Sequence, residues 1–273
     1  MIQFRPEPLD IGPFKVARKA LGEAVPDIEE LQDEGLASNG IWVYSMSCIP
    51  GQTWLNGARG KGSAARVTIN KSLARILSKS YIEGSADQVV ESQLKPRLNI
   101  LLASAEPKIQ PFHAAAKDML QNIDQLKVLP LFLSHFDLNE VNILVDDECN
   151  VSGIVDWELA SILPFGMGFC RIHTLAGEFS ERKFHMPPEF EDSERGVWKE
   201  IFTGVPVNVR KVVEANLEVV NFSVKLGTLL NAFQLEDDGK SVGGINPVVV
   251  EALPKFLSYR IPQLRGSAPP YSK

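Results

Sequence analysis

Two short apolar runs separated by a polar segment constrain this chain more than any other feature. Residues 143–145 and 154–155 are β-branched or aliphatic, and the polar residues 146–150 between them favour a turn. The sequence therefore predicts a β-hairpin. Because paired strands lie about 5 Å apart, we expect Asn142 at its entry and Asp156 at its exit to be neighbours, with Asp137 on the loop just before them.

The residues around this hairpin match a motif that serves phosphoryl transfer. His135, Asp137, Leu138 and Asn142 fill the pattern H-x-D-L-x-x-x-N. In that chemistry one aspartate accepts the proton of the attacking hydroxyl, while an asparagine and a second, downstream aspartate hold magnesium. Asp137 is therefore the candidate catalytic base, and Asn142 and Asp156 are the candidate metal ligands. For each residue taken alone, a place in a turn or at a strand end is the favoured interpretation, so the hypothesis depends on their joint spacing.

Together with this motif, three further segments resemble the aminoglycoside phosphotransferase family of small-molecule kinases, and in particular its fungal members. The segments are residues 40–51, 163–166 and 256–262. The resemblance implies an α+β, protein-kinase-like bilobal fold. Its N-terminal β-sheet lobe would be reduced to residues 1–50, and a mainly helical C-terminal lobe, residues 51–273, would contain the catalytic hairpin at 134–158.

The same resemblance implies a function. The chain would use ATP and Mg²⁺ to transfer the γ-phosphoryl group to a hydroxyl of a small molecule, whose identity the fold does not fix. Met46 would lie at the back of the adenine pocket. Ser47, Cys48 and Ile49 would form the hinge whose backbone pairs with the base, since the following Pro50 and Gly51 end the strand and leave its polar groups for another partner.

The N-terminal lobe departs from the family pattern. Kinases begin with a glycine-rich strand pair that covers the phosphates, followed by a strand whose lysine pairs with a glutamate on a helix. Here the chain begins at that third strand, and Arg5 occupies the lysine position. Arginine can bind phosphate bidentately, but the exchange is not conservative. The helix position expected to carry the carboxylate is Lys19, so Arg5 is either a nucleotide-binding residue or an exposed terminal cation. Glu158 is either a support for the metal site or an ordinary surface glutamate.

Two other functions remain open. The chain could be a catalytically impaired kinase-like binding protein, or a truncated gene product, that lacks the phosphate-covering loop. A metal-dependent hydrolase that uses His135 and Asp137 is less favoured, because no further His or Cys ligand lies at a supporting spacing. Residues 57–63 resemble a phosphate-binding loop, but Leu55 and Gly62 break the required pattern, which leaves a flexible basic loop.

Composition limits the remaining classes. The chain has 273 residues, of which 44% are hydrophobic, and a formal net charge of -6, which argues against nucleic-acid binding. No signal-peptide core or membrane span of roughly 18 apolar residues is evident, and three cysteines suit a reducing compartment, so we expect a cytoplasmic protein with no membrane partner. The oligomeric state stays open.

Hydrophobic periodicity predicts strands and helices along the chain. We expect a strand at 2–5, a helix at Phe14–Leu21 that stops at Gly22, an extended segment from Val25, a polar turn at 33–40 and a strand at 41–46. From Ser72 onward the pattern is helical. The predicted helical segments are 73–77, 89–94, 112–126, 198–202, 207–233 and 248–253, with an exposed loop at 235–244 and a frayed tail at 267–273.

Overall fold

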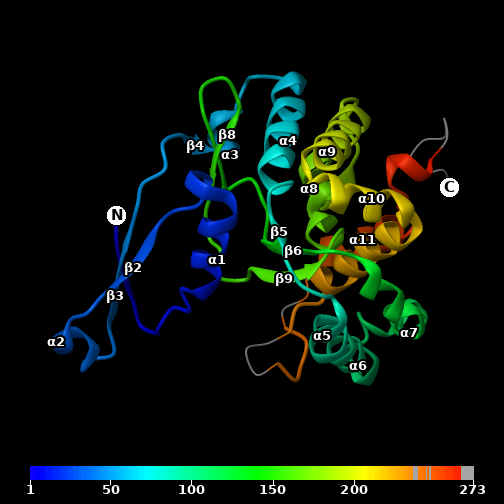
Figure 1. Cartoon of the computed structure of the whole chain (residues 1–273), viewed down its shortest axis with the longest axis horizontal. Coiled ribbons are helices and arrows are strands. Elements are labelled where there is room, and N and C mark those ends of the chain that lie inside the picture. The colour runs from blue at the N-terminus through cyan, green and yellow to red at the C-terminus, as the bar shows by residue number, and fades with distance from the viewer. Residues whose placement is uncertain (236–238, 244, 246, 266–273) are drawn as a thin grey trace.

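The computed structural model describes residues 1–235, 239–243, 245 and 247–265, with only the backbone of Val248. Figure 1 shows a small β-sheet and short helices at the left, a larger helical part at the right, and strands between them. The expected α+β organisation is confirmed. The candidate site lies where these two parts meet.

The N-terminal sheet has the strand order β1-β3-β2, with both outer strands antiparallel to the central one. Its strands are β1 (Ile2–Arg5), β2 (Ile28–Leu31) and β3 (Trp42–Met46). Ile2 lies opposite Ser45, and Ile28 lies opposite Met46. The strands predicted at 2–5 and 41–46 are confirmed to within one residue.

Helix α1 (Gly12–Leu21) buries an apolar stripe in the hydrophobic core. Phe14, Ala17 and Leu21 are its buried residues, at the three- and four-residue spacing of one helix face. The helix ends where predicted, because Gly22 adopts a φ of 65°, a left-handed conformation that glycine adopts without steric cost.

The segment predicted as a polar turn contains a short helix, α2 (Glu34–Ala37). The Asp33 carboxylate accepts a hydrogen bond of 2.9 Å from the backbone N–H of Leu36. An acidic residue at this position satisfies one of the free N–H groups of a first helical turn. The sequence therefore contained the capping residue, but the polar and glycine residues around it favoured a turn over a helix.

The catalytic hairpin forms as predicted. Strand β7 (Ile143–Val145) pairs with β8 (Val151–Ile154), and a further strand, β4 (Gln52–Thr53), lies on the other side of β7. The register places Ile143 opposite Ile154. The hairpin turn thus starts at Asp146, and its open end faces the loop that carries the motif.

The connection between the two parts of the molecule packs tightly on this hairpin. A Cβ placed on Gly153 would lie 2.6 Å from Cγ2 of Ile49, too close for a real contact. The Ser152 hydroxyl donates a 2.6 Å hydrogen bond to the carbonyl of Pro50. Glycine in β8 therefore marks a close approach of another segment.

A third three-stranded sheet has the order β5-β6-β9. Its strands are β5 (Tyr81–Ile82), β6 (Leu131–Ser134) and β9 (Ser161–Pro164). Every residue of β6 is buried, so no alternation between apolar and polar residues marks it as a strand in the sequence. A further hairpin joins β10 (Glu178–Ser180) to β11 (Lys183–His185).

The rest of the described chain is helical, as predicted, with α4 packed along α9. Several predicted boundaries were wrong, among them the start of α9, which begins at Phe190 rather than at 198, and the helix predicted at 207–233, which is divided at Asn216. Helix α4 begins at Ser63 rather than near Ser72, since only residues 58–62 of the predicted basic loop are non-helical. The remaining helical elements are η1 (Gly22–Ala24), α3 (Trp54–Gly57), α4 (Ser63–Leu77), α5 (Asp87–Val89), the π-helical η2 (Val90–Leu94), α6 (Lys95–Ala103), η3 (Gln110–Phe112), α7 (His113–Asn122), η4 (Ile123–Val128), η5 (Met167–Arg171), α8 (Ile172–Ala176), α9 (Phe190–Gly204), α10 (Val207–Ala215), α11 (Leu217–Ala232), α12 (Pro247–Leu257) and η6 (Pro262–Leu264).

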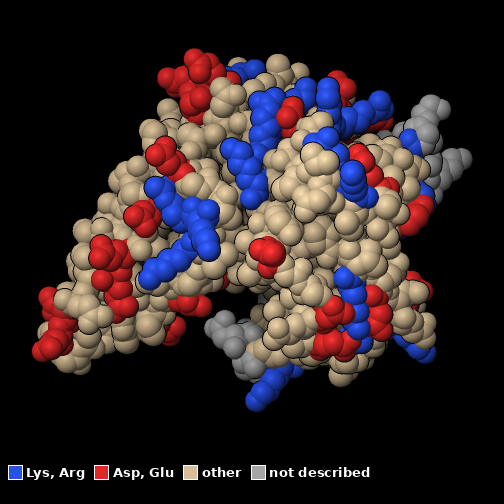
Figure 2. Space-filling model, viewed as in Figure 1, with Lys and Arg blue, Asp and Glu red and all other residues tan. Residues whose placement is uncertain are grey.

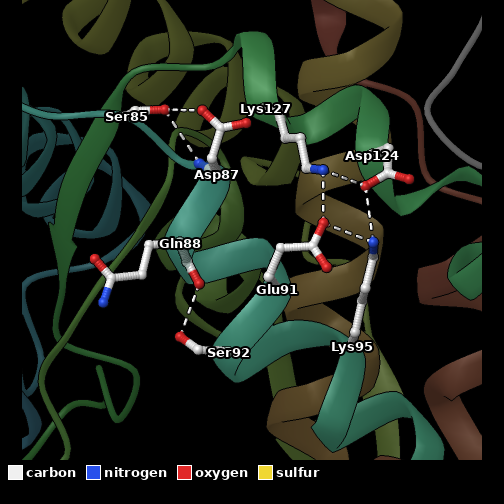
Figure 3. Close-up of polar contacts among 8 residues, drawn as sticks. All are labelled: Ser85, Asp87, Gln88, Glu91, Ser92, Lys95, Asp124 and Lys127. Carbon is white, nitrogen blue, oxygen red and sulfur yellow. Dashed lines mark hydrogen bonds and ion pairs between the residues drawn. The ribbon is translucent and has the colours of Figure 1, made fainter.

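An ion-pair cluster joins η2 and α6 to η4 on the surface. Glu91 contacts Lys95 at 2.7 Å and Lys127 at 2.6 Å, and Asp124 contacts the same two amines at 3.0 and 2.7 Å (Figure 3). The alternating charges form a closed ring. Because exposed pairs of this kind are screened by water, each of them contributes little to stability.

The surface and the cysteines give further checks. Figure 2 shows acidic side chains gathered over the N-terminal sheet, at the left, and both signs of charge over the helical part. Cys48, Cys149 and Cys170 are all free thiols. Among the described residues, no helix has the length and apolar character needed to cross a membrane. The predicted tail at 267–273 and part of the predicted loop at 235–244 lie outside the described residues.

Candidate active site

Asn139 shapes the loop that carries Asp137. Its side-chain oxygen accepts hydrogen bonds from the backbone N–H groups of Val141, at 3.0 Å, and Asn142, at 3.1 Å. Its amide nitrogen donates to the Asp137 carboxylate at 3.3 Å. Sequence analysis did not single out Asn139. The available signal was an asparagine placed where its side chain can bond backbone groups two residues on, as in turns.

Asn142 also contacts Asp137. Its amide nitrogen donates to the backbone carbonyl of Asp137 at 3.0 Å and to the carboxylate atom Oδ2 at 3.3 Å. Asn139 donates to the same Oδ2. With Oδ2 held by two amides, Oδ1 of Asp137 makes no hydrogen bond to a described residue and stays available as an acceptor.

Asp156 lies beside Asn142, as the hairpin predicts. The N–H of Val155 donates to the carbonyl of Asn142 at 2.9 Å, which continues the pairing of β7 with β8 by one step. Asp156 itself has a φ of 64°. This left-handed backbone is uncommon for a residue other than glycine, and such conformations cluster at functional sites.

Negative charge accumulates around Asp156. Its side chain is exposed, and no described residue gives its carboxylate a hydrogen bond or ion pair. Partial withdrawal from water raises the pKa of Asp156, and the carboxylates of Glu158 and Asp137 raise it further, whereas Arg5 acts in the opposite direction. The site therefore contains more anionic than cationic charge, which favours a bound cation.

Arg5 and Glu158 form a two-pronged ion pair across the site. Nη2 of Arg5 donates to Oε2 of Glu158 at 3.0 Å, and Nη1 contacts Oε1. The pair joins β1 to the segment just past Asp156. Arg5 is thus not a free terminal cation, and its carboxylate partner comes from this segment rather than from α1, where Lys19 is exposed.

His135 connects the motif loop to the segment that follows β8. Its Nε2 lies 2.8 Å from the carbonyl of Val155, and its ring packs edge-on against Trp157 with centroids 4.6 Å apart. Since a carbonyl only accepts, Nε2 carries the proton. Burial lowers the pKa of His135, so the ring is neutral at physiological pH. These contacts hold the loop in place.

Arg171 and Asn231 also hold the loop, through hydrogen bonds to its backbone. Arg171 donates from Nε to the carbonyl of Leu138 at 2.9 Å and from Nη1 to the side-chain oxygen of Asn231 at 3.1 Å. Asn231 in turn donates to the carbonyl of Phe136, which has a φ of 64°. The residues that flank Asp137 are therefore held by groups on η5 and α11.

The predicted hinge residues lie between β3 and the hairpin, and their backbone groups differ in what they bond. The N–H and C=O of Met46 both pair with Met1, at 2.9 and 2.8 Å, and the N–H of Ser47 donates to Asp27 at 2.9 Å. Cys48 and Ile49 make no backbone hydrogen bond to a described residue. The side chain of Ile49 packs on Gly153.

The residues present fit a magnesium ion. Magnesium prefers hard oxygen ligands and is usually held by one or two carboxylates together with water and phosphate. Asp156 offers its carboxylate, and the amide of Asn142 has its nitrogen engaged with Asp137, which leaves its oxygen as a donor to metal. The described residues contain no group of three or more His, Cys, Asp or Glu side chains that could hold a metal.

The fold resembles known kinases. Over 94% of this chain, the structure matches an ethanolamine kinase from Plasmodium vivax with a TM-score of 0.52 and 9% identity, covering 70% of that protein. It also matches a Ralstonia eutropha protein provisionally described as an aminoglycoside phosphotransferase, with a TM-score of 0.51 and 15% identity over 94% of this chain and 82% of that one. A β-sheet lobe, a helical lobe and a motif-bearing hairpin between them define a protein-kinase-like fold.

The sequence comparison identifies the family. The model of the phosphotransferase enzyme family matches residues 33–169, half of the chain, from the N-terminal sheet through the catalytic hairpin. The chain belongs to this family. The resemblance to aminoglycoside phosphotransferases is thereby confirmed. No protein of the curated set matches the sequence.

Proposed function

We propose that this protein is an ATP- and Mg²⁺-dependent kinase that phosphorylates a hydroxyl group of a small molecule. The observation that carries the proposal is the convergence of Asp137, Asn142 and Asp156 at the open end of one hairpin. Membership of a phosphotransferase family supports the reaction class. Membership of this family does not favour the alternative of an impaired binding protein.

Asp137 acts as the catalytic base in this proposal. Its Oδ2 is held by the amides of Asn139 and Asn142, so Oδ1 can accept the proton of the acceptor hydroxyl. A base must lie within hydrogen-bond reach of the proton it removes. The clamp of Arg171 and Asn231 keeps the loop around Asp137 in one conformation.

Asn142 and Asp156 would hold the magnesium ion, and Arg5 would hold the nucleotide phosphates. A bound magnesium neutralises charge on the phosphates. The bidentate contact with Glu158 orients Arg5 while its guanidinium retains further N–H groups that can donate to phosphate oxygens. Glu158 thus takes the orienting role that a helix glutamate has in other kinases.

The adenine base would bind at the predicted hinge, through Cys48 and Ile49. Met46 and Ser47 belong to the same proposed pocket, but their N–H groups are engaged within the protein. The free backbone groups of the next two residues are therefore the ones available to pair with the edge of a base. The proposed base-binding segment is therefore limited to the backbone of Cys48 and Ile49.

Two substitutions separate binding from chemistry. Asp156→Ala should abolish Mg²⁺-dependent ATP binding measured by calorimetry, because it removes the only carboxylate of the proposed metal pair. Asp137→Asn should leave that binding intact while removing phosphoryl transfer. Asp147→Ala, in the hairpin turn, is the matched control and should change neither. Unaltered ATP affinity in the Asp156→Ala protein would refute the metal site, and unaltered turnover in Asp137→Asn would refute the base.

A further inference from the structure

A cavity of about 600 Å³ opens beside the catalytic loop. It lies between Asn139–Val141 of the loop, Leu55 of α3, Leu175 of α8 and Phe179 of β10. Its volume is within the range of small-molecule sites, about 300–1,000 Å³. Asn139 lines the cavity and also donates to the Asp137 carboxylate, so the side chain of Asn139 connects the cavity to the proposed base.

The described lining is apolar on several sides. Leu55 and Val141 leave about half of their side-chain surface exposed, at 54% and 51%, and both face this cavity. Leu175, Phe179 and Val249 add further apolar surface from three other elements. Exposed apolar side chains gathered from separate elements around one concave space favour a ligand with a substantial apolar part.

The charges around the cavity do not favour a polycation. Among the described lining residues, the carboxylates are Glu140 and Glu178, and the cations are Arg171 and Arg182. Glu140 also faces an internal cation, since Nη1 of Arg66 lies 3.9 Å from it. Nε of Arg66 further contacts Glu189 at 3.4 Å. In this cavity the carboxylates do not outnumber the arginines, so a ligand with several positive charges would gain no net attraction from them.

We propose that this cavity is the acceptor site and that it selects an alcohol with an apolar body and no positive charge, rather than a polycationic amino sugar. The proposal deepens the kinase assignment and rests on it for the fate of the hydroxyl. The hydroxyl end would approach Asp137 past Asn139, and the apolar body would lie against Leu55, Val141 and Phe179. Glu140 then serves the fold through its ion pair with Arg66.

Binding can be measured without turnover. We would titrate the full-length protein with 4-phenylbutanol, its cationic counterpart 4-phenylbutylamine, and gentamicin, using ligand-observed saturation-transfer NMR. The alcohol should bind more tightly than the amine or gentamicin. Leu55→Glu should weaken binding of the alcohol about 5-fold, by removing apolar contact and adding a charge. Val207→Glu, at a site 65% exposed on α10 and away from the cavity, is the matched control and should have no effect.

The outcomes distinguish this inference from the proposed function. Tighter binding of gentamicin or of the amine than of the alcohol would overturn the substrate class. Equal effects of Leu55→Glu and Val207→Glu would overturn the location. Phosphorylation of gentamicin would support the kinase assignment while overturning this inference. Loss of alcohol binding in Leu55→Glu alone, in a protein that transfers no phosphate, would support the cavity while refuting the kinase assignment.

Discussion

Arg5, on the first strand, is bound bidentately by Glu158, which lies two residues past Asp156 and 153 residues further along the chain. The contact joins the N-terminal sheet directly to the segment that carries a proposed metal ligand. In a kinase with the usual lobe, a lysine and a helix glutamate make the equivalent pair. Here both partners differ, but the arrangement still places one oriented cation beside the proposed metal site.

A double-mutant cycle tests whether Glu158 acts through Arg5. We expect Arg5→Ala to weaken ATP binding about 10-fold, because a charge-assisted bond to phosphate is lost. Glu158→Ala should weaken it less, and should have no additional effect in an Arg5→Ala background. Calorimetric titrations with Mg-ATP measure all four proteins.

The matched control is Arg5→Lys, which keeps the charge but loses the two-pronged geometry. Its ATP affinity should lie between those of wild type and Arg5→Ala. Additive effects of the two alanine substitutions would contradict the orienting role. Unfolding free energies should change little in these variants, because Arg5 and Glu158 are partly exposed to water.

The contact between Ile49 and Gly153 predicts a stability effect. Gly153→Ala would place a methyl group 2.6 Å from Cγ2 of Ile49, so we expect a loss of about 1–3 kcal/mol of unfolding free energy, as for other overpacked positions. Denaturant titration measures this. Ile49→Ala removes the clashing atoms, so the double substitution should cost less than the sum of the two single ones. Strict additivity would show that the clash is absent.

Because His173 is buried, we expect the free energy of unfolding to fall in mild acid. Burial, followed by the charge of Arg265, lowers the pKa of His173 to about 3. The ring stacks on Phe256 with centroids 4.7 Å apart. Between this value and the ordinary histidine pKa near 6.5, the unfolded chain binds a proton that the folded protein excludes. Lowering the pH from 7 to 5 should therefore destabilise the fold by about 2 kcal/mol through this residue.

His173→Phe isolates this contribution, because it keeps an aromatic ring next to Phe256 and cannot be protonated. The difference in unfolding free energy between pH 7 and pH 5 should shrink by about 2 kcal/mol in the variant. The remaining pH dependence includes His135, whose pKa burial also lowers. An unchanged pH dependence would show that His173 is protonated in the folded protein.

Local signals made the hairpin and its motif predictable. A polar turn separates residues 143–145 from residue 154, and the length of this turn fixes how the two strands pair. The proximity of Asn142 and Asp156 therefore followed from strand geometry alone. Strand β1 and the end of α1 at Gly22 were predictable for the same reason. In each case the residues that decide the structure are neighbours in sequence.

Long-range contacts were not predictable. Nothing in the sequence distinguishes Glu158 from a surface glutamate, because its partner Arg5 is brought near only by the packing of the N-terminal sheet. Strand β6 was missed since it is buried on both faces, and the start of α4 was missed since no side chain caps it. The cavity near Asn139 required the relative positions of α3, α8 and β10, which no local pattern contains.

Ile49 packs on Gly153 with no space for a side chain between them. If Cys48 and Ile49 receive the base while Asn142 and Asp156 receive the phosphates through their metal, both ends rest on one rigid β-ribbon. Movement of the N-terminal sheet away from the helical part would then leave the distance from base to phosphate unchanged. Only the contact of Arg5 with the phosphates would vary with this movement.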